Sequence, residues 1–593
     1  MEFLNKYIKK YWKPFLLAVF CLTVEAVCDL LQPTIMAKIV DVGVKNKDLS
    51  FVLKMSYVML GVTALGALGA VSRNILASIV SQKFGSELRS DLFTKVQGFS
   101  FESIDKYDGA SLLTRLTNDV TMVQNFTNGL MRIFVKAPLL CIGSFIMAVR
   151  LNAKMAMIFV VVIPIVVLLI VMNMKIGYPF FRKIQKALDN VNSVMREYLS
   201  GVRVVKAFNR FSYETNRFKK SNKNLSDIST NAMRIMAIFP PGITLIVNLG
   251  IVATIWIGGV KVNSGNMQVG EIIAFINYMT QILFSLMMIS NVFTMFVRAK
   301  ASAERIGEVF NEEKTLKNLP ELSGASVTNF LKDNGKDSEV KGRIDFENVS
   351  FSYPGTTGEP VLKNLTFSCS QGETIGIIGS TGSGKTSMVS LITRFYDVNK
   401  GKIKINNIDI RDMDVKNLRE KIAIVPQKIV LFSGSIMDNI RWGKEAATVD
   451  EIKVAAEAAQ AHEFISLLPE GYNTVLGQGG VNISGGQKQR ISIARALIKQ
   501  SEILILDDCT SAVDVTTEAK IRDAIKTYSG KLTCLIIAQR ITSVINADKI
   551  LVLENGELVG KGNHGELMET CEVYKDIFRS QIGKEVVQSG KEE

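Results

Sequence analysis

The distribution of apolar residues divides the chain into two parts of different character. In the first part, residues 155–172, 235–260 and 272–297 contain no charged side chain. Each stretch is long enough to cross a bilayer core of about 30 Å as a helix. Three weaker candidates contain or end at charged residues: 14–37, with Glu25 and Asp29; 55–72, ended by Arg73; and 133–149, with Lys136. The pattern predicts six spans, and the alternative is a buried helical core.

The loops between the predicted spans differ in length on the two sides of the membrane. Three of them, 42–52, 150–154 and 261–270, are short. Residues 80–130 and 175–230 are long, with mixed charge and few helix breakers. We therefore expect an α-helical membrane domain of six transmembrane helices with long cytoplasmic extensions.

The pattern changes to short apolar strands alternating with helices from about residue 342. Such alternation predicts an α/β domain. The polar segment before it contains proline and glycine, which indicates a linker. The predicted division is therefore a transmembrane domain at 1–310, a linker at 311–341, an α/β domain at 342–580 and a charged tail at 581–593.

Much of the formal net charge of +14 lies in the loops between the predicted spans. In a soluble protein this excess would suggest nucleic acid as a partner. Here many of the basic residues lie between spans, as Lys206, Arg210 and Arg217 do. Positive loops mark the cytoplasmic side. We therefore predict a multi-pass protein of the cell membrane with both termini cytoplasmic. We expect it to contact the lipid bilayer and not to bind nucleic acid.

The N-terminus and the cysteines add smaller expectations. Residues 1–13 are basic and amphipathic, which predicts a helix lying on the inner membrane surface. The seven cysteines form no CxxC pair. This dispersed set predicts packed, reduced thiols rather than a metal site.

A glycine-rich loop follows a short strand at 374–378. It reads Gly379, Ser380, Thr381, Gly382, Ser383, Gly384, Lys385, Thr386, and it opens a helix. The glycines allow backbone N–H groups to surround phosphate oxygens at the positive end of the helix. Lys385 is expected to reach the β- and γ-phosphates and Thr386 to bind the metal, so ATP and Mg²⁺ are the predicted cofactors.

Two further segments complete the expected chemistry. The apolar strand 504–506 ends at Asp507, which can hold Mg²⁺ through water, and Asp508 follows where a base could orient the attacking water. Ser484, Gly485, Gly486 and Gln487 open another helix, which is a second anion-binding terminus. The two termini need not serve the same nucleotide.

Together these motifs resemble an ATP-binding-cassette (ABC) exporter half-transporter, in which six spans are fused to one P-loop nucleotide-binding domain. The resemblance covers nearly all of residues 1–580. It rests on the phosphate loop at 379–386, Gln427 in "IVPQ", the signature at 484–487, the acid pair at 507–508 and "SAVD" at 511–514.

The resemblance implies a head-to-tail dimer that holds two ATP molecules. Each ATP lies between one chain's phosphate loop and the other chain's signature. Tyr353 is then expected to stack on adenine, Gln427 to sense the magnesium and the coupling loops, and Asp514 to contact the opposite subunit. The alternatives are a core aromatic for Tyr353 and a surface loop residue for Gln427.

Two positions depart from the family's pattern. Asp508 stands where the family usually has Glu, and it is shorter by about 1.5 Å. A misplacement near 1 Å can cost on the order of 10²-fold in rate. Gln539 stands where the family usually has a His after the next strand. His564 fits a helix start, which indicates a structural role. We therefore predict that this site binds ATP and hydrolyses it slowly or not at all.

The intact signature beside a weakened base predicts a heterodimer, of the kind found among bacterial multidrug exporters. Its partner would be a second ABC half-transporter with the usual Glu and His. The signature Ser484–Gln487 of this chain would complete the partner's competent site.

The resemblance assigns coupling helices to the inner loops, with candidates at 107–119 and 209–216. Asn277, Gln281 and Ser285 share one face of the last span. That face indicates either a pore for varied amphipathic molecules or hydrogen bonds between helices. Glu25 and Asp29 also share a face, and acids inside a membrane usually face a cavity or a partner. They either attract cationic drugs or pair with Arg73.

The predicted function is that of an ATP-driven exporter subunit. It would move amphipathic or hydrophobic small molecules, such as drugs, lipids or peptides, out of the cytoplasm or inner leaflet, with hydrolysis mainly at the partner's composite site. One alternative is a membrane-bound regulatory or sensor subunit that binds ATP without transport. An ABC ATPase acting on DNA is a further alternative, which six spans argue against.

Overall fold

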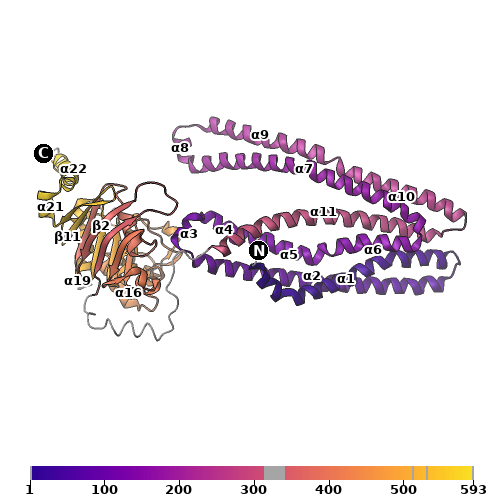
Figure 1. Cartoon of the computed structure of the whole chain (residues 1–593), viewed down its shortest axis with the longest axis horizontal. Coiled ribbons are helices and arrows are strands. Elements are labelled where there is room, and N and C mark those ends of the chain that lie inside the picture. Colours follow the sequence, from indigo (N-terminus) through magenta and orange to yellow (C-terminus); the bar gives the residue numbers. More distant parts are fainter. Residues whose placement is uncertain (1–2, 313–340, 510–512, 529–531, 590–593) are drawn as a thin grey trace. The chain divides into compact units, whose positions relative to one another are not determined.

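A computed structural model describes residues 3–312, 341–509, 513–528 and 532–589 (Figure 1). The chain divides into two compact units: Met1–Gly98 with Asp108–Glu312, and Phe99–Tyr107 with Glu313–Glu593. The predicted linker lies outside the described residues except at its ends. The last helix runs to Ser589 and so extends through most of the predicted tail.

The described part of the first unit is built from long helices (Figure 1). Six helical segments among the described residues are long and apolar enough to cross a membrane, and each overlaps one predicted span, which confirms that prediction. The helices are α1 (Phe3–Lys38), η1 (Ile39–Val44), α2 (Leu49–Gln97), α4 (Gly109–Thr114), η2 (Arg115–Asp119), α5 (Val120–Gly129), η3 (Leu130–Phe134), α6 (Lys136–Leu151), α7 (Ala153–Ser200), α8 (Val202–Ala207), α9 (Phe211–Met236), α10 (Phe239–Asn263) and α11 (Val269–Asn311).

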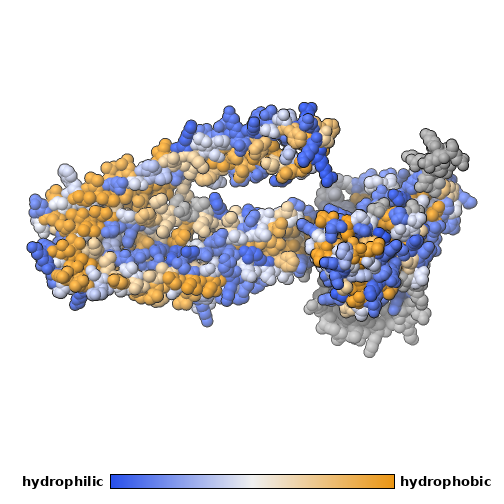
Figure 2. Space-filling model, turned by 180° about the vertical axis from the view of Figure 1, so that it is seen from behind, coloured by the Kyte–Doolittle hydropathy of each residue, from blue (hydrophilic) through white to orange (hydrophobic). Residues whose placement is uncertain are grey.

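The helices also form the predicted extensions beyond the spans. Figure 2 shows apolar residues gathered over one end of this unit, and polar and apolar residues mixed over the arm formed by α8 and the adjoining ends of α7 and α9. The start of α1 differs from expectation. Tyr7 and Lys6 bond to Asp91 of α2 over 2.6 and 2.7 Å. Residues 3–13 therefore continue the first long helix instead of forming a separate surface helix.

The polar stripe of α11 is used for packing between helices. Gln281 accepts a hydrogen bond from the Ser144 hydroxyl over 2.9 Å and donates to the Asp29 carbonyl over 3.1 Å. Ser285 is buried and donates to a carbonyl of its own helix. Tyr278, three residues before Gln281, is fully buried and donates to the Leu30 carbonyl. These contacts favour the packing interpretation over a pore surface at Gln281 and Ser285.

The second unit is the predicted α/β domain. A six-stranded sheet has the order β12-β11-β3-β10-β9-β6, and its strands run parallel except β12. An antiparallel sheet has the order β2-β1-β4-β5. The strands are β1 (Ile344–Phe351), β2 (Leu362–Cys369), β3 (Thr374–Gly379), β4 (Lys400–Ile405), β5 (Ile408–Asp409), β6 (Ile422–Val425), β7 (Gly434–Ser435), β8 (Val475–Leu476), β9 (Ile503–Asp507), β10 (Thr533–Ile537), β11 (Lys549–Glu554) and β12 (Glu557–Gly562).

The helical segments of this unit include some on each face of the six-stranded sheet. They are α3 (Phe101–Lys106), α13 (Lys385–Ile392), η4 (Ile410–Asp412), α14 (Val415–Glu420), α15 (Ile436–Arg441), α16 (Val449–Ala458), α17 (His462–Ser466), η5 (Gly471–Asn473), η6 (Gln478–Gly480), α18 (Gly485–Leu497), α19 (Val515–Tyr528), α20 (Ile541–Val544), α21 (His564–Thr570) and α22 (Glu572–Ser589).

Two apolar clusters lie on opposite faces of that sheet. Successive side chains of a strand point to opposite faces. In β9, Ile503 and Ile505 join the cluster that contains α13 and the antiparallel sheet. Leu504 and Leu506 join the cluster that contains α18 and α19. The helices that begin at the phosphate loop and at the signature are therefore on different faces.

Candidate functional site

The phosphate loop forms the strand–loop–helix arrangement that the sequence predicts. It leaves β3 at Gly379 and enters α13 at Lys385. Gly384 has a φ of +95°, in the left-handed region that favours glycine. A Cβ at Gly379 would lie 2.1 Å from the Leu553 carbonyl oxygen, so no larger residue fits there. The backbone is thus held in the curled form that can surround a phosphate group.

The charged groups beside this loop suit a magnesium nucleotide. The Lys385 ammonium points into the loop and donates to the carbonyls of Gly379 and Ser380 over 2.9 and 2.8 Å. Burial lowers the pKa of Lys385, and the charges of Asp508 and Asp507 partly oppose that shift. Burial and then the charge of Asp508 raise the pKa of Asp507, while a hydrogen bond from Thr386 lowers it. A cation would relieve the repulsion between buried Asp507 and its partly exposed neighbour Asp508.

The donor types fit Mg²⁺ rather than a softer metal. Thr386 and Asp507 offer hard oxygen atoms, and Mg²⁺ usually takes one or two protein ligands together with water and phosphate oxygens. No group of three or more His, Cys, Asp and Glu side chains that could hold a metal ion occurs among the described residues. Thr386 and Asp507 would therefore hold the metal, which supplies positive charge for the phosphates.

The structure brings three of the predicted residues together at one carboxylate. The Oδ2 atom of Asp508 accepts a hydrogen bond from Gln539 Nε2 over 2.8 Å and one from Gln427 Nε2 over 3.2 Å. Asp508 has a φ of +47°, a region that short polar residues such as Asp tolerate better than most. The candidate base is therefore oriented by two side-chain amides, and one of them occupies the position expected for His.

Gln581 of α22 holds the same loop, and it is not among the residues predicted from the sequence. Its Nε2 atom donates to the Gln539 carbonyl over 2.8 Å, and its Oε1 atom accepts from the Ile541 N–H over 2.8 Å. Both bonds involve the backbone of the loop, so they do not depend on the side chain at 539. A glutamine in a charged terminal helix carries no local pattern that would predict this contact.

Tyr353 lies beside the phosphate-loop helix. Its hydroxyl is 3.0 Å from the Ser387 hydroxyl. Its ring meets those of Phe351 and Tyr396 edge to face, with centroids 4.9 and 5.2 Å apart. The side chain is partly buried. It is near enough to the phosphate loop for the expected role, and that role stays a prediction.

The signature stands at an exposed helix start. Ser484 caps α18: its hydroxyl accepts from the Gln487 N–H over 3.3 Å, and the Gln487 side chain accepts from the Ser484 N–H over 2.9 Å. Ser484 and Gly485 are exposed, and α18 packs on the face of the sheet opposite to α13. An anion bound at this terminus is therefore available to a second molecule.

Asp514 caps α19 within its own chain. It accepts hydrogen bonds from the Thr516 hydroxyl and, over 2.9 Å, from the Thr517 N–H. The bond from Thr516 is the main cause of a lowered pKa for Asp514. Its predicted contact with the opposite subunit stays a prediction, and Ser511 and Ala512 of the same motif lie outside the described residues.

A short helix before the predicted coupling segment packs on the nucleotide-binding unit. The ring of Phe101 stacks on Phe395 with centroids 4.1 Å apart, and Asp105 accepts a hydrogen bond from the Tyr396 hydroxyl. Both residues belong to α3, whereas the predicted segment 107–119 forms α4 and η2 in the first unit. The coupling role predicted for 107–119 stays a prediction.

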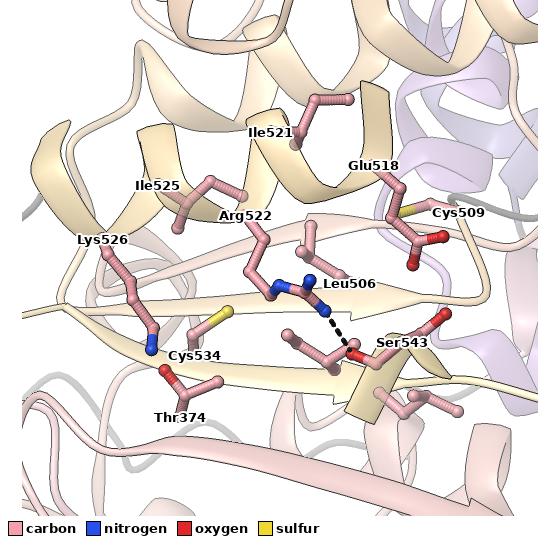
Figure 3. A pocket seen from close by; sticks show the side chains of 12 residues that line it. Thr374, Leu506, Cys509, Glu518, Ile521, Arg522, Ile525, Lys526, Cys534 and Ser543 are labelled. Atoms are coloured by element: carbon pink, nitrogen blue, oxygen red, sulfur yellow. Dashed lines mark hydrogen bonds between the residues drawn. The ribbon is translucent and has the colours of Figure 1, made fainter. Parts of the chain in front are cut away.

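The small cavity in Figure 3 is separate from this chemistry. It lies under α19, has a volume of about 30 Å³ and includes the bond from Arg522 to the Ser543 carbonyl. That volume has room for about two water molecules and is too small for a nucleotide.

Two cysteines that line this cavity are packed in the core. Burial raises the pKa of the Cys534 thiol to about 12 and also raises the pKa of the Cys509 thiol. These are packed thiols, as the dispersed cysteines predict.

His564 has the structural role that its position predicts. It is the first residue of α21, directly after the β11–β12 hairpin, and its Nδ1 atom is 2.8 Å from the hydroxyl of buried Tyr574. It therefore joins the end of the hairpin to α22 and takes no part in the phosphate site.

Six apolar helical segments, a P-loop α/β domain and a separate anion-binding signature define a membrane-bound transport ATPase. Comparison with known protein families supports this class of protein. Residues 15–287 match the model of the ABC transporter transmembrane region, and residues 362–511 match the model of the ABC transporter domain.

Relatives match over almost the entire chain. The uncharacterized ABC transporter ATP-binding protein YfiB of Bacillus subtilis is 42% identical over 97% of this chain and 98% of its own. An ATP-dependent lipid A-core flippase of Chromohalobacter salexigens is 31% identical over 98% and 97%. A solved bacterial Atm1-family ABC exporter with ATP bound has a TM-score of 0.78 at 22% identity, over 96% of this chain and 98% of that one.

The chain belongs to the ABC transporter family. It has the fold of an exporter half-transporter, with the membrane region and the nucleotide-binding domain in one chain. It is accordingly a multi-pass membrane protein and an ATPase coupled to transport.

Proposed function

We propose that the protein is one subunit of a heterodimeric exporter of amphipathic or hydrophobic compounds. Its own phosphate loop binds ATP and hydrolyses it slowly. Its signature completes the competent site of a second half-transporter that has the usual Glu and His. The termini of both subunits are cytoplasmic, and hydrolysis at the partner's site drives transport.

The observation that carries this proposal is the contact between Gln539 and Asp508. A general base must lie within hydrogen-bond reach of the water whose proton it takes. Asp508 is one carbon shorter than Glu, and its Oδ2 atom already accepts bonds from Gln539 and Gln427. A neutral amide at 539 cannot exchange a proton as an imidazole can. Both changes weaken the same step at the same site.

The signature supports the other half of the proposal. Ser484 and Gly485 are exposed and the cap of α18 is complete. An intact signature beside a weak base is useful only when the ATP it contacts is hydrolysed elsewhere. A homodimer of this chain would have two weak sites.

The test begins with the complex purified from its own membrane in mild detergent. Mass spectrometry should find this chain with a second half-transporter that has Glu and His at the two positions. After reconstitution, ATP should drive an amphipathic dye into inverted vesicles. Purification of this chain alone would contradict the heterodimer. ATP binding without dye movement would favour the sensor alternative.

Replacing Tyr353 with alanine should weaken ATP binding at this site by about fivefold to a hundredfold. Stacking of a base on an aromatic ring contributes about 1–3 kcal/mol, and about 1.4 kcal/mol corresponds to a factor of ten. Photolabelling of the intact complex with 8-azido-ATP, followed by peptide mapping, measures this site separately from the partner's.

Tyr353→Phe is the matched control for that measurement. It retains the ring and loses the contact of the hydroxyl with Ser387. We expect near-normal labelling in Tyr353→Phe. Equal labelling of Tyr353→Ala and the unchanged protein would show that Tyr353 is a core aromatic without a role in stacking.

A further inference from the structure

A cavity of about 590 Å³ in the membrane unit has a lining with an excess of positive charge. Arg73, Arg132 and Lys136 line it, and no acidic residue does so among the described side chains. The remaining lining consists of amides and apolar groups: Asn125, Asn128, Gly129, Ile133, Met288 and Met295. The residues come from α2, α5, η3, α6 and α11.

Two of the three cations are already neutralised by the acids of α1. Lys136 Nζ is 2.5 Å from Glu25 Oε1 and 3.0 Å from Asp29 Oδ2. Arg73 Nε is 3.2 Å from Glu25 Oε2, in an orientation that pairs the charges without a hydrogen bond. The sequence predicts Arg73 as a possible partner of these acids, and the structure adds Lys136. Glu25 and Asp29 are therefore occupied and are poorly suited to attract a cationic drug.

Arg132 is the cation that stays uncompensated. It forms no ion pair with any of the described residues, and its side chain is exposed. Its backbone carbonyl accepts a hydrogen bond from Arg73 Nη1 over 2.8 Å, which fixes the helix beside the ion pairs. Two carboxylates thus balance Arg73 and Lys136, and one positive charge is left over. A charge in a membrane-spanning region is costly unless water or a counter-ion accompanies it.

We propose that this cavity binds the head group of an amphipathic anion, with Arg132 as the residue that contacts its phosphate or carboxylate. The proposal rests on the transport function proposed above and names its substrate class. A guanidinium suits this role because its fork of N–H groups matches a phosphate or carboxylate in two-point contact. Asn125 and Asn128 supply further amide groups. The flexible thioethers of Met288 and Met295 can pack against hydrocarbon tails of different shapes.

The test compares two dansyl-labelled probes with the same dodecyl chain, an alkyl phosphate and an alkyl trimethylammonium. Binding is measured by fluorescence on the full complex in nanodiscs of neutral lipid without ATP. The unchanged protein should bind the phosphate probe more tightly. Arg132→Gln should weaken that binding about tenfold to a hundredfold, the range for loss of a hydrogen bond to a charged group. Binding of the trimethylammonium probe should not fall.

Two matched variants separate charge from other effects. Arg132→Lys retains the charge and should recover part of the affinity. Arg298→Gln removes an exposed arginine of α11 that does not line the cavity, and it should leave binding unchanged. Equal binding of the two probes by the unchanged protein, or an equal loss in Arg132→Gln and Arg298→Gln, would overturn the proposal.

Inorganic phosphate serves as a competitor that has the charge without the tail. It should displace the alkyl phosphate only at much higher concentration. Competition at equal strength would show a site for free anions and contradict the amphipathic ligand. The transport assay then separates this proposal from the proposed function. Dye transport that does not respond to Arg132→Gln removes the cavity from the path, while Arg132-dependent binding without ATP-driven transport removes the transport function.

Discussion

Replacing Ser484 with glycine should lower the ATPase rate of the purified complex by about tenfold to a hundredfold. In the proposed heterodimer, the Ser484 hydroxyl contacts the phosphates of the ATP on the partner's phosphate loop. A hydrogen bond to a charged group contributes about 1.5–3 kcal/mol, and each 1.36 kcal/mol corresponds to about tenfold in rate. The effect is large because this hydroxyl serves the site that hydrolyses.

Glycine is the informative replacement because Ser484 also caps α18. Alanine at an N-cap typically costs about 1 kcal/mol of helix stability, whereas glycine costs only a few tenths. Ser484→Gly therefore removes the hydroxyl with little damage to the helix. Ser484→Thr is the control that retains both the hydroxyl and the cap, and it should keep most of the activity.

Asp508→Asn is the comparison that decides whether this chain's own site is weak. It should change the steady-state rate by less than about twofold, under about 0.4 kcal/mol in activation free energy, because the proposed site already contributes little to turnover. Replacing the partner's Glu with Gln should nearly abolish the rate. If Asp508→Asn is as inactive as that variant, Asp508 is a working base and the weak-site proposal is wrong.

The sequence predicts those features of this protein that local patterns determine. Apolar runs long enough to cross a bilayer are local patterns, and so is the glycine-rich strand–loop–helix sequence at 374–392. The departures at Asp508 and Gln539 are visible because they stand at fixed positions after two strands. Their mutual contact was not predicted, yet the parallel pairing of β9 with β10 makes it a natural consequence.

Contacts between distant segments could not be predicted in this way. Gln581 reaches the loop at 539–541 from a helix whose charged sequence gives no signal. Asp105 meets Tyr396 although 291 residues separate them. The amphipathic pattern at 107–119 shows that a helix is present there, but it does not show which unit that helix packs against. Helical spacing likewise places Gln281 on one face without showing that Ser144 lies opposite.

The slow site should be repairable by restoring the two altered groups together. We expect Asp508→Glu/Gln539→His to raise hydrolysis on the order of 10²-fold in a complex whose partner carries Glu→Gln. The longer carboxylate recovers the reach that Asp508 lacks, since a misplacement near 1 Å can cost that factor. The loop should tolerate the change at 539 because Gln581 holds it through the backbone of Gln539 and Ile541. The left-handed φ of residue 508 costs a non-glycine residue on the order of 1–3 kcal/mol in stability, a cost that Asp508 already carries in part.

Single-turnover hydrolysis of radiolabelled ATP by the reconstituted complex measures this gain directly, because the partner's site is silent in that background. Asp508→Glu alone should recover part of the rate, since Gln539 can still donate to the new carboxylate. Gln539→His alone should recover little, because the base stays too short. The control adds Lys385→Ala to Asp508→Glu/Gln539→His. Its hydrolysis rate should fall back to that of the complex without the repair, because the phosphate loop no longer holds the nucleotide. No gain in Asp508→Glu/Gln539→His, with normal 8-azido-ATP labelling, would show that something other than these two side chains limits hydrolysis at this site.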